Sequence, residues 1–121
     1  MSLRFITTLV LSIVYLTPPA WADFETGMDA YNREDYATAL REWRILAEQG
    51  NALAQAKLGL MYKDGLGVLQ DFIQAHKWYN LAGANGDKFA TESRDRLAER
   101  MTPAQIAEAQ QLAREWQLKH K

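Results

Sequence analysis

Apolar residues recur with the spacing of an amphipathic helix in two stretches of the chain, 35–51 and 71–87. They occupy positions 36, 39, 40, 43, 46 and 47 of the first stretch, and 72, 75, 79 and 82 of the second. Such i, i+3, i+4, i+7 spacing gives a helix one apolar face that can pack against a core. Asp35 and Asp71 stand just before the apolar positions, where their carboxylates can accept hydrogen bonds from the first backbone N–H groups. The pattern therefore predicts a helix in each stretch.

Turn signals at the end of each stretch indicate that the helices fold back on their neighbours. Gly50 and Gly86 follow the apolar positions, and glycine readily takes the left-handed conformation that ends many helices. Asn51 and Asp87 come next, and each is a suitable N-cap for a following helix. The two stretches align at an offset of 36 residues. The chain is therefore expected to be a repeated array of helix hairpins.

Further helices are expected before, between and after these two stretches. Residues 24–50 form a first hairpin with a short turn, and residues 52–62 form a helix between the stretches. Within that helix Gly59 has no side chain, which predicts close approach of a neighbouring helix. After residue 87 the apolar pattern weakens, as expected for a terminal repeat that faces water on one side.

A last helix is predicted over residues 102–118. Thr102 is its N-cap, Pro103 occupies the first helical position and Gln105 is placed to complete a capping box. Ile106, Ala109, Ala113 and Trp116 form one apolar stripe along it. This helix is expected to cap the core.

A motif of many positions runs through residues 52–87. It comprises Leu58-Gly59-Leu60-Met61-Tyr62, Gly65-x-Gly67-Val68, Gln70-Asp71-Phe72, Ala75, Trp78-Tyr79, Ala82 and Asn85-Gly86. This motif resembles one complete Sel1-like repeat, and the resemblance extends over about residues 30–87. It implies an all-α fold: a short right-handed solenoid of antiparallel, tetratricopeptide-like helix hairpins, closed by the capping helix. It also implies a curved surface that binds other proteins.

Two residues depart from the pattern of the family that this motif resembles. Gly83 stands where alanine is usual, which is expected to loosen its helix slightly, and His76 stands where leucine is common. Some secreted relatives carry a cysteine pair in each repeat and have been discussed as penicillin-binding or weakly β-lactam-hydrolysing. This chain contains no cysteine, which argues against such an activity here.

The first 22 residues have the pattern of a cleaved export signal. Arg4 precedes a mostly apolar run from Phe5 to Leu16, and Ala20-x-Ala22 has the small residues of a cleavage site. The run is shorter than the roughly 20 apolar residues that a membrane span requires. We therefore expect a signal peptide over residues 1–22, a mature domain over residues 23–121, and a periplasmic or secreted location. An uncleaved N-terminal anchor is the alternative, whereas a lipid anchor would require a cysteine.

Composition and candidate chemistry argue against catalysis. The chain has 14 Lys and Arg against 15 Asp and Glu, which does not favour binding to nucleic acid or to an anionic membrane. Ser93 lies in a predicted helix without a nucleophile elbow, and His76 has no His or Cys partner at helical spacing. Gly65-x-Gly67 lacks the preceding strand of a phosphate loop. We expect no catalytic residue, no cofactor and no metal.

These observations favour an exported protein–protein interaction module that binds a peptide or helix of an envelope or secreted partner in a curved helical groove. The helix over residues 52–62 is expected to line the concave side, where exposed residues such as Gln55 or Lys57 are the first candidates for contact. Two alternatives stay open: a cell-wall or β-lactam-directed activity like that discussed for cysteine-bearing relatives, and a purely structural role in stacking.

Overall fold

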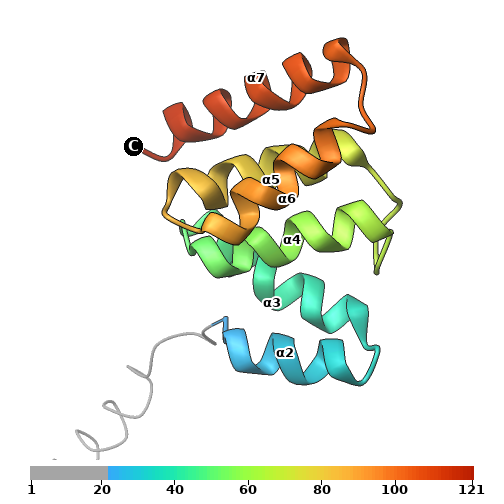
Figure 1. Cartoon of the computed structure of the whole chain (residues 1–121). Coiled ribbons are helices and arrows are strands. Elements are labelled where there is room, and N and C mark those ends of the chain that lie inside the picture. The colour runs from blue at the N-terminus through green and yellow to red at the C-terminus, as the bar shows by residue number, and fades with distance from the viewer. Residues whose placement is uncertain (1–21) are drawn as a thin grey trace, which may run out of the picture.

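The computed structural model describes residues 22–121, which form six α-helices and no strand. The helices are α2 (Phe24–Asn32), α3 (Tyr36–Glu48), α4 (Ala52–Asp64), α5 (Phe72–Ala84), α6 (Lys88–Ala98) and α7 (Pro103–Lys119). The expected all-α array is therefore confirmed (Figure 1). Apart from Ala22, the expected export signal lies outside the described residues.

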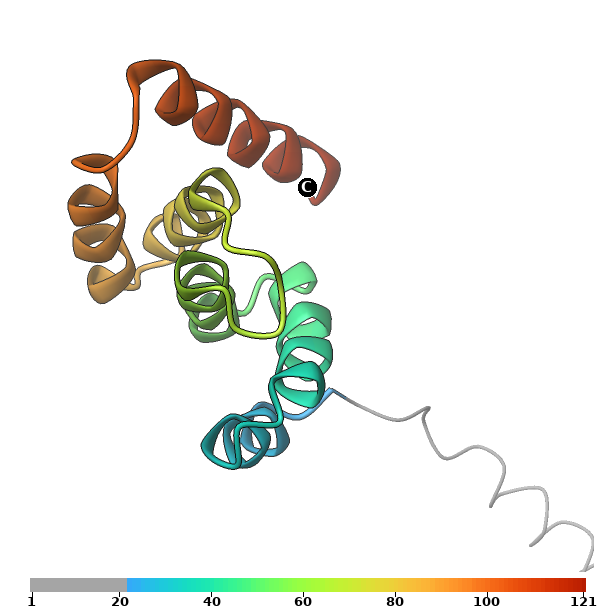
Figure 2. The same ribbon diagram turned by 90° about the vertical axis from the view of Figure 1, so that its right-hand side faces the viewer.

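Consecutive helices stack as a short solenoid. Helix α2 packs on α3, and α4 packs on α5, while α3 contacts α4 and so joins the two hairpins. Helix α5 also carries α6 and α7, which lie on either side of it. In Figure 2 the alternate helices α2, α4 and α6 lie along one side of the molecule, and α6 projects beyond α4. This face is the one on which a groove can form between successive first helices.

The expected N-caps are confirmed. In each cap, the side-chain oxygen accepts a hydrogen bond from the backbone N–H three residues later. The pairs are Asp35 with Thr38 (3.3 Å), Asn51 with Ala54 (2.9 Å), Asp71 with Gln74 (3.1 Å), Asp87 with Ala90 (3.0 Å) and Thr102 with Gln105 (3.1 Å). At the start of α7 the Gln105 side chain also accepts from the Thr102 N–H, which completes the predicted capping box.

Three helix ends close with the same pair of backbone hydrogen bonds. After α3, the Gly50 N–H donates to the Ala47 carbonyl and the next N–H donates to the Leu46 carbonyl, which is a Schellman motif. The chain repeats these bonds after α2 and after α5. The residue in the left-handed region is Gly86 after α5, with φ of 97°, but Glu34 after α2, with φ of 64°. The hairpin turns therefore share one geometry.

Large aromatic rings of the second helices pack against glycines of the first helices. Trp43 of α3 lies over Gly27 of α2, and Tyr79 of α5 lies over Gly59 of α4. A β-carbon on Gly59 would lie 2.5 Å from Cδ1 of Tyr79, well inside van der Waals contact. The close approach that Gly59 predicted is confirmed. Gly27 has the same role, although the sequence pattern did not single it out.

Helix α7 closes the array by packing across α5 and reaching back to the end of α3. The Trp116 indole N–H donates to Oε2 of Glu48 at 3.0 Å, and His120 lies 3.0 Å from the same oxygen. Trp116 also meets Trp78 edge to face. Ala109 and Ala113 are buried against the core. The predicted apolar stripe of this helix thus covers the core as expected.

Gly83 packs closely against α6, and the slight loosening of its helix stays a prediction. A β-carbon at this position would collide with the Thr91 hydroxyl oxygen of α6. The alanine usual in the related repeats would therefore require the Thr91 side chain to rotate or α6 to shift. The glycine is explained by close packing, as at Gly59.

Candidate functional site

Helix α4 has apolar side chains on two faces. One face is buried in the core and includes Ala54, Leu58 and Met61. The other face carries Leu53, which is 49% exposed, and the partly buried Leu60. A surface helix of a globular protein ordinarily needs only one apolar face. Ala56, on the same side of α4, is buried with Ala90 and Leu97 of α6 and so contributes to folding. The exposure of Leu53, by contrast, is not explained by packing within the domain.

This second face of α4 lines a cavity together with the start of α6. The cavity has a volume of about 280 Å³ and is lined by Leu53, Ala56, Lys57, Leu60, Asp87 and Phe89, a set that we call the apolar pocket. Phe89 is 63% exposed, so two large apolar side chains border one opening. The volume lies near the lower end of the roughly 300–1,000 Å³ typical of ligand sites. The pocket suits a small number of apolar side chains.

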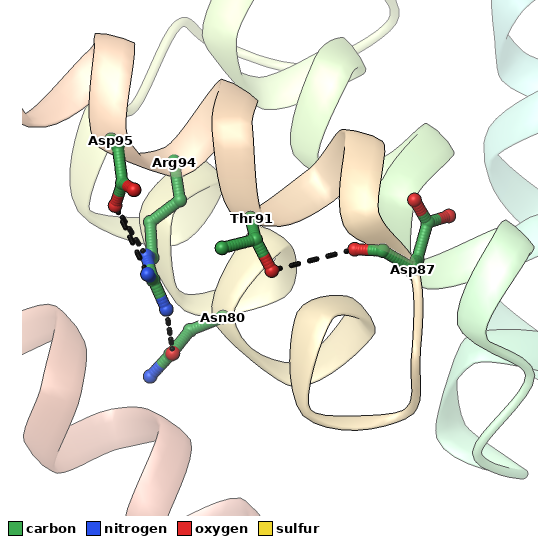
Figure 3. A network of polar contacts seen from close by, with 5 residues as sticks. All are labelled: Asn80, Asp87, Thr91, Arg94 and Asp95. Carbon is green, nitrogen blue, oxygen red and sulfur yellow. Dashed lines mark hydrogen bonds and ion pairs between the residues drawn. The ribbon is translucent and has the colours of Figure 1, made fainter.

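A side-chain hydrogen bond joins α6 to α5, and further polar contacts lie within α6. The Arg94 guanidinium donates to the Asn80 side-chain oxygen at 2.9 Å and pairs with Asp95 at 3.0 Å (Figure 3). The Thr91 hydroxyl donates to the backbone carbonyl of Asp87 at 3.4 Å, within the first turn of α6. Arg94 therefore joins α6 to α5 and does not line the apolar pocket, whose wall carries Phe89.

We expected Gln55 to be exposed on the concave side and to contact a partner there. It is instead fully buried. Its side-chain amide donates to the Ala47 carbonyl at 3.1 Å, and its oxygen accepts from the Asn85 side chain at 3.1 Å. Gln55 thus connects the ends of α3 and α5. Lys57 is partly exposed at the apolar pocket, with its ammonium 5.9 Å from the Trp43 ring centroid. Only Lys57 of the two lies where contact was expected.

The residues considered for chemistry do not form a reactive group. His76 is only 3% exposed, and its Nδ1 has no hydrogen-bond partner. Burial, with the positive charge of Arg94 as a second cause, lowers the pKa of His76 and favours the neutral ring. Ser93 is buried in α6 and accepts a hydrogen bond from Arg96 at 3.5 Å. Within residues 22–121 no hydrogen bond joins Ser93 to a histidine.

Residues 22–121 contain no cluster of three or more His, Asp or Glu side chains placed to hold a metal ion. None of the helices in that range has the length and apolar character needed to cross a bilayer.

Of the residues that line the apolar pocket, sequence reasoning identified only Lys57, although a signal for the leucines was present. Leu53 and Leu60 share one face of α4, and Leu58 and Met61 share another. Apolar positions on two faces of one helix leave the orientation of that helix ambiguous, so its exposed side could not be assigned from periodicity alone. The exposure of Phe89 could not be predicted in this way, because it depends on the orientation of α6 relative to α5.

The comparisons with known proteins agree with this architecture. Residues 52–87 match the model of the Sel1 repeat. Among solved structures, the chain is similar to that of a protective antigen present in uropathogenic Escherichia coli strains, which displays an SLR fold; the TM-score is 0.74 and the identity 33%. That match covers 80% of this chain and 22% of the other chain. The comparison with curated proteins gave no match. The chain therefore contains one stretch that matches the Sel1 repeat, within an all-α array whose fold is similar to the SLR fold.

Proposed function

We propose that this protein is an exported, non-catalytic interaction module that binds a short peptide segment of an envelope or secreted partner. The observation that carries the proposal is the second apolar face of α4, which borders the apolar pocket with Leu53 and faces the exposed ring of Phe89. Apolar side chains gathered at one opening are typical of a binding site, whereas singly scattered ones are not.

The size of the site favours a short ligand over a long wrapped partner. Only α4 and α6 contribute side chains to the apolar pocket, apart from the N-cap residue Asp87. The first hairpin does not extend this apolar surface, because α2 exposes Glu25, Thr26 and Asp29. A ligand that follows α4 and α6 therefore needs one apolar anchor and a few neighbouring residues.

Selection of random peptides tests the proposal directly. A phage library of peptides about eight residues long, sufficient to extend well beyond the pocket, is selected on the purified protein. We expect enriched sequences with an apolar residue at a fixed place. Leu53→Ser and Phe89→Ser are expected to weaken binding of a selected peptide by about tenfold or more, as for residues at the centre of an interface.

Ile45→Ser is the matched control for these variants. Ile45 lies on α3, outside the apolar pocket, and its 45% exposure is close to the 49% exposure of Leu53. Binding by this variant is expected to equal that of the wild type. A selection that enriches no sequence, or equal loss in all three variants, contradicts peptide binding at this site.

The exported location is supported by the pattern of Arg4, the apolar run and Ala20-x-Ala22. The test is N-terminal sequencing of the protein recovered from cell fractions after expression of the full chain. We expect the envelope or medium fraction to contain a protein that begins at Asp23. A protein that stays in the cytoplasm with its first residues intact contradicts this part of the proposal.

A further inference from the structure

A second cavity lies between the same two helices, toward their C-terminal ends. It has a volume of about 130 Å³ and is lined by Lys63 of α4 and by Ser93, Arg96, Leu97 and Arg100 of α6 and the turn that follows it; we call this set the basic pocket. It contains three cationic side chains, whereas the whole chain has a formal net charge of −1. Positive charge is therefore concentrated at this cavity.

The two arginines of the basic pocket are not neutralised by the ion pairs of the described residues. Those pairs join Lys63 to Asp64 at 3.7 Å but do not include Arg96 or Arg100. Arg100 instead lies over the Phe72 ring, with its guanidinium carbon 4.7 Å from the centroid. This contact limits the freedom of the side chain, so less entropy is lost when an anion binds.

Ser93 adds a buried polar group to the basic pocket. It is 8% exposed, and its hydroxyl oxygen accepts from the Arg96 guanidinium at 3.5 Å. The hydroxyl hydrogen therefore remains available to donate to an acceptor in the cavity. Guanidinium groups and a hydroxyl donor together match the planar, two-oxygen geometry of a carboxylate.

The basic pocket and the apolar pocket lie in line along α4 and α6. Their α4 residues, from Leu53 through Leu60 to Lys63, recur at helical spacing on one face, as do Phe89 and Arg96 of α6. Figure 1 shows the two helices running in the same direction. We call the two pockets together the α4–α6 groove.

The length of the groove sets the spacing of a ligand that reaches both ends. From Phe89 to Arg96 the rise along α6 is about 10 Å, and to residue 100 it is about 16 Å, at 1.5 Å per residue. An extended peptide covers about 3.3 Å per residue. About three to five residues therefore separate a group in the apolar pocket from one in the basic pocket.

We infer that the ligand of the α4–α6 groove is an extended peptide with an apolar side chain at one end and a carboxylate three to five residues away, held by Arg96, Arg100 and Lys63. This inference rests on the proposed function and adds the chemical class of the ligand. The carboxylate belongs either to an Asp or Glu side chain or to the C-terminus of the partner, and both sources supply the same anion.

Matched synthetic peptides test the inference on the purified protein. Each peptide carries a fluorophore, one leucine, three alanines and then two further residues. In the first two peptides these residues are Glu-Glu or Gln-Gln, and the C-terminus is amidated. The third peptide ends in Gln-Gln with a free carboxylate. Binding is measured by fluorescence anisotropy. The Glu-Glu peptide is expected to bind about tenfold or more tightly than the amidated Gln-Gln peptide, as for charged hydrogen bonds. The third peptide shows whether a terminal carboxylate suffices.

Variants and salt separate this inference from the proposed function. Arg96→Gln with Arg100→Gln is expected to reduce the affinity of the Glu-Glu peptide to that of the amidated Gln-Gln peptide, while Phe89→Ser weakens both. Raising the salt from about 0.05 M to about 0.5 M should weaken only carboxylate-bearing peptides. Arg114→Gln on α7, outside both pockets, is the matched control.

Each outcome bears on one of the two proposals. Equal affinity of the Glu-Glu and amidated Gln-Gln peptides overturns the carboxylate assignment and leaves peptide binding intact if Phe89→Ser still weakens both. Competition with inorganic phosphate is a further test. Phosphate that displaces the Glu-Glu peptide from the wild type, but not from the Arg96→Gln, Arg100→Gln variant, supports an anion site at the arginines. The amidated Gln-Gln peptide should not be displaced from either protein. Failure of all three peptides to bind, together with a library selection that enriches nothing, overturns both proposals.

Discussion

The α2–α3 and α4–α5 hairpins pack through the same contact, a glycine of the first helix beneath a large ring of the second, but they differ on their outer faces. Helix α2 exposes polar side chains, whereas α4 exposes Leu53 at the apolar pocket. Since the first hairpin folds without an apolar outer face, hairpin packing does not require one. Hairpin packing therefore does not account for the exposure of Leu53 on α4.

The hairpins also differ at two internal positions related by the offset of 36 residues. Leu40 of α3 corresponds to His76 of α5, and Trp43 corresponds to Tyr79. The second hairpin thus contains a buried imidazole and a buried phenol, and burial raises the pKa of Tyr79 to about 12. Substitutions at these positions show whether the shared contact or these differences dominate stability.

Truncating the large ring of either hairpin is expected to have the largest effect. Trp43→Ala and Tyr79→Ala each remove a side chain that is at most 1% exposed. Each is expected to lower the free energy of unfolding by about 3–5 kcal/mol, because the cavity left behind collapses only partly. Urea unfolding followed by circular dichroism measures both. Similar losses of unfolding free energy in the two variants support the same glycine–ring contact in both hairpins. A much smaller loss in one variant would show that the contact does not contribute equally in the two hairpins.

Gly59 supplies the control for the ring contact in the second hairpin. Gly59→Ala in the wild type places a β-carbon against Tyr79 and is expected to destabilise the protein by about 1–2 kcal/mol. In the Tyr79→Ala background the same substitution should stabilise by up to about 1 kcal/mol, because alanine favours a helix over glycine. An effect of the same sign in both backgrounds would contradict the proposed contact.

Removing the polar link between the two hairpins is expected to have a smaller effect. Gln55→Met removes one hydrogen bond from the Ala47 carbonyl, which still accepts from the Gly50 N–H, and one from the Asn85 amide, which still donates to the Gly50 carbonyl at 3.4 Å. Most of the side-chain volume is preserved, so we expect a loss of about 0.5–1.5 kcal/mol in the free energy of unfolding, measured by urea denaturation. Lys57→Met, on the exposed side of the same helix, is the control and should change stability little. Equal effects would show that burial of Gln55 is not the cause.

Gln55 illustrates what could and could not be predicted from the sequence. The caps at Asp35 and Thr102 were predicted correctly because they depend on residues close together in the chain. The burial of Gln55 depends on which face of α4 meets α3 and α5, and a helix with two apolar faces does not specify this. A groove lined by the helix over residues 52–62 was expected, but the α6 residues that complete it were not assigned, because they lie far from α4 in the sequence.

Making the second hairpin resemble the first at His76 is expected to raise stability. His76→Leu removes the buried Nδ1 that has no partner and should add about 1 kcal/mol at neutral pH. The lowered folded-state pKa of His76 means that the unfolded chain binds a proton more readily. Wild-type stability is therefore fully present above the unfolded pKa, near 6.5, and is lost as the pH falls below it.

Thermal unfolding at pH values between about 5 and 8, the range in which histidine titrates, checks this prediction. The gain from His76→Leu should grow as the pH falls. Arg94 and Asp95 also act on the ring, so Arg94→Gln is measured in parallel to separate its positive charge from burial. His120→Gln is the control for the other histidine. A gain from His76→Leu that does not vary with pH is inconsistent with this account.

The smallest effect is expected at the turn of the first hairpin. Glu34 adopts the left-handed conformation that Gly86 adopts in the second hairpin, which costs a side-chain-bearing residue roughly 1 kcal/mol. Glu34→Gly removes this cost but gives the unfolded chain more freedom, so the net gain in the free energy of unfolding is about 0.5 kcal/mol.

Gly86→Ala is the reverse change in the second hairpin. No atom outside the adjacent residues lies within 4 Å of the added β-carbon. The expected loss of about 1 kcal/mol in the free energy of unfolding therefore comes from the backbone conformation. Differential scanning calorimetry of both variants checks the signs. Destabilisation by Glu34→Gly would show that the glutamate side chain stabilises this turn by a contact that the second hairpin lacks.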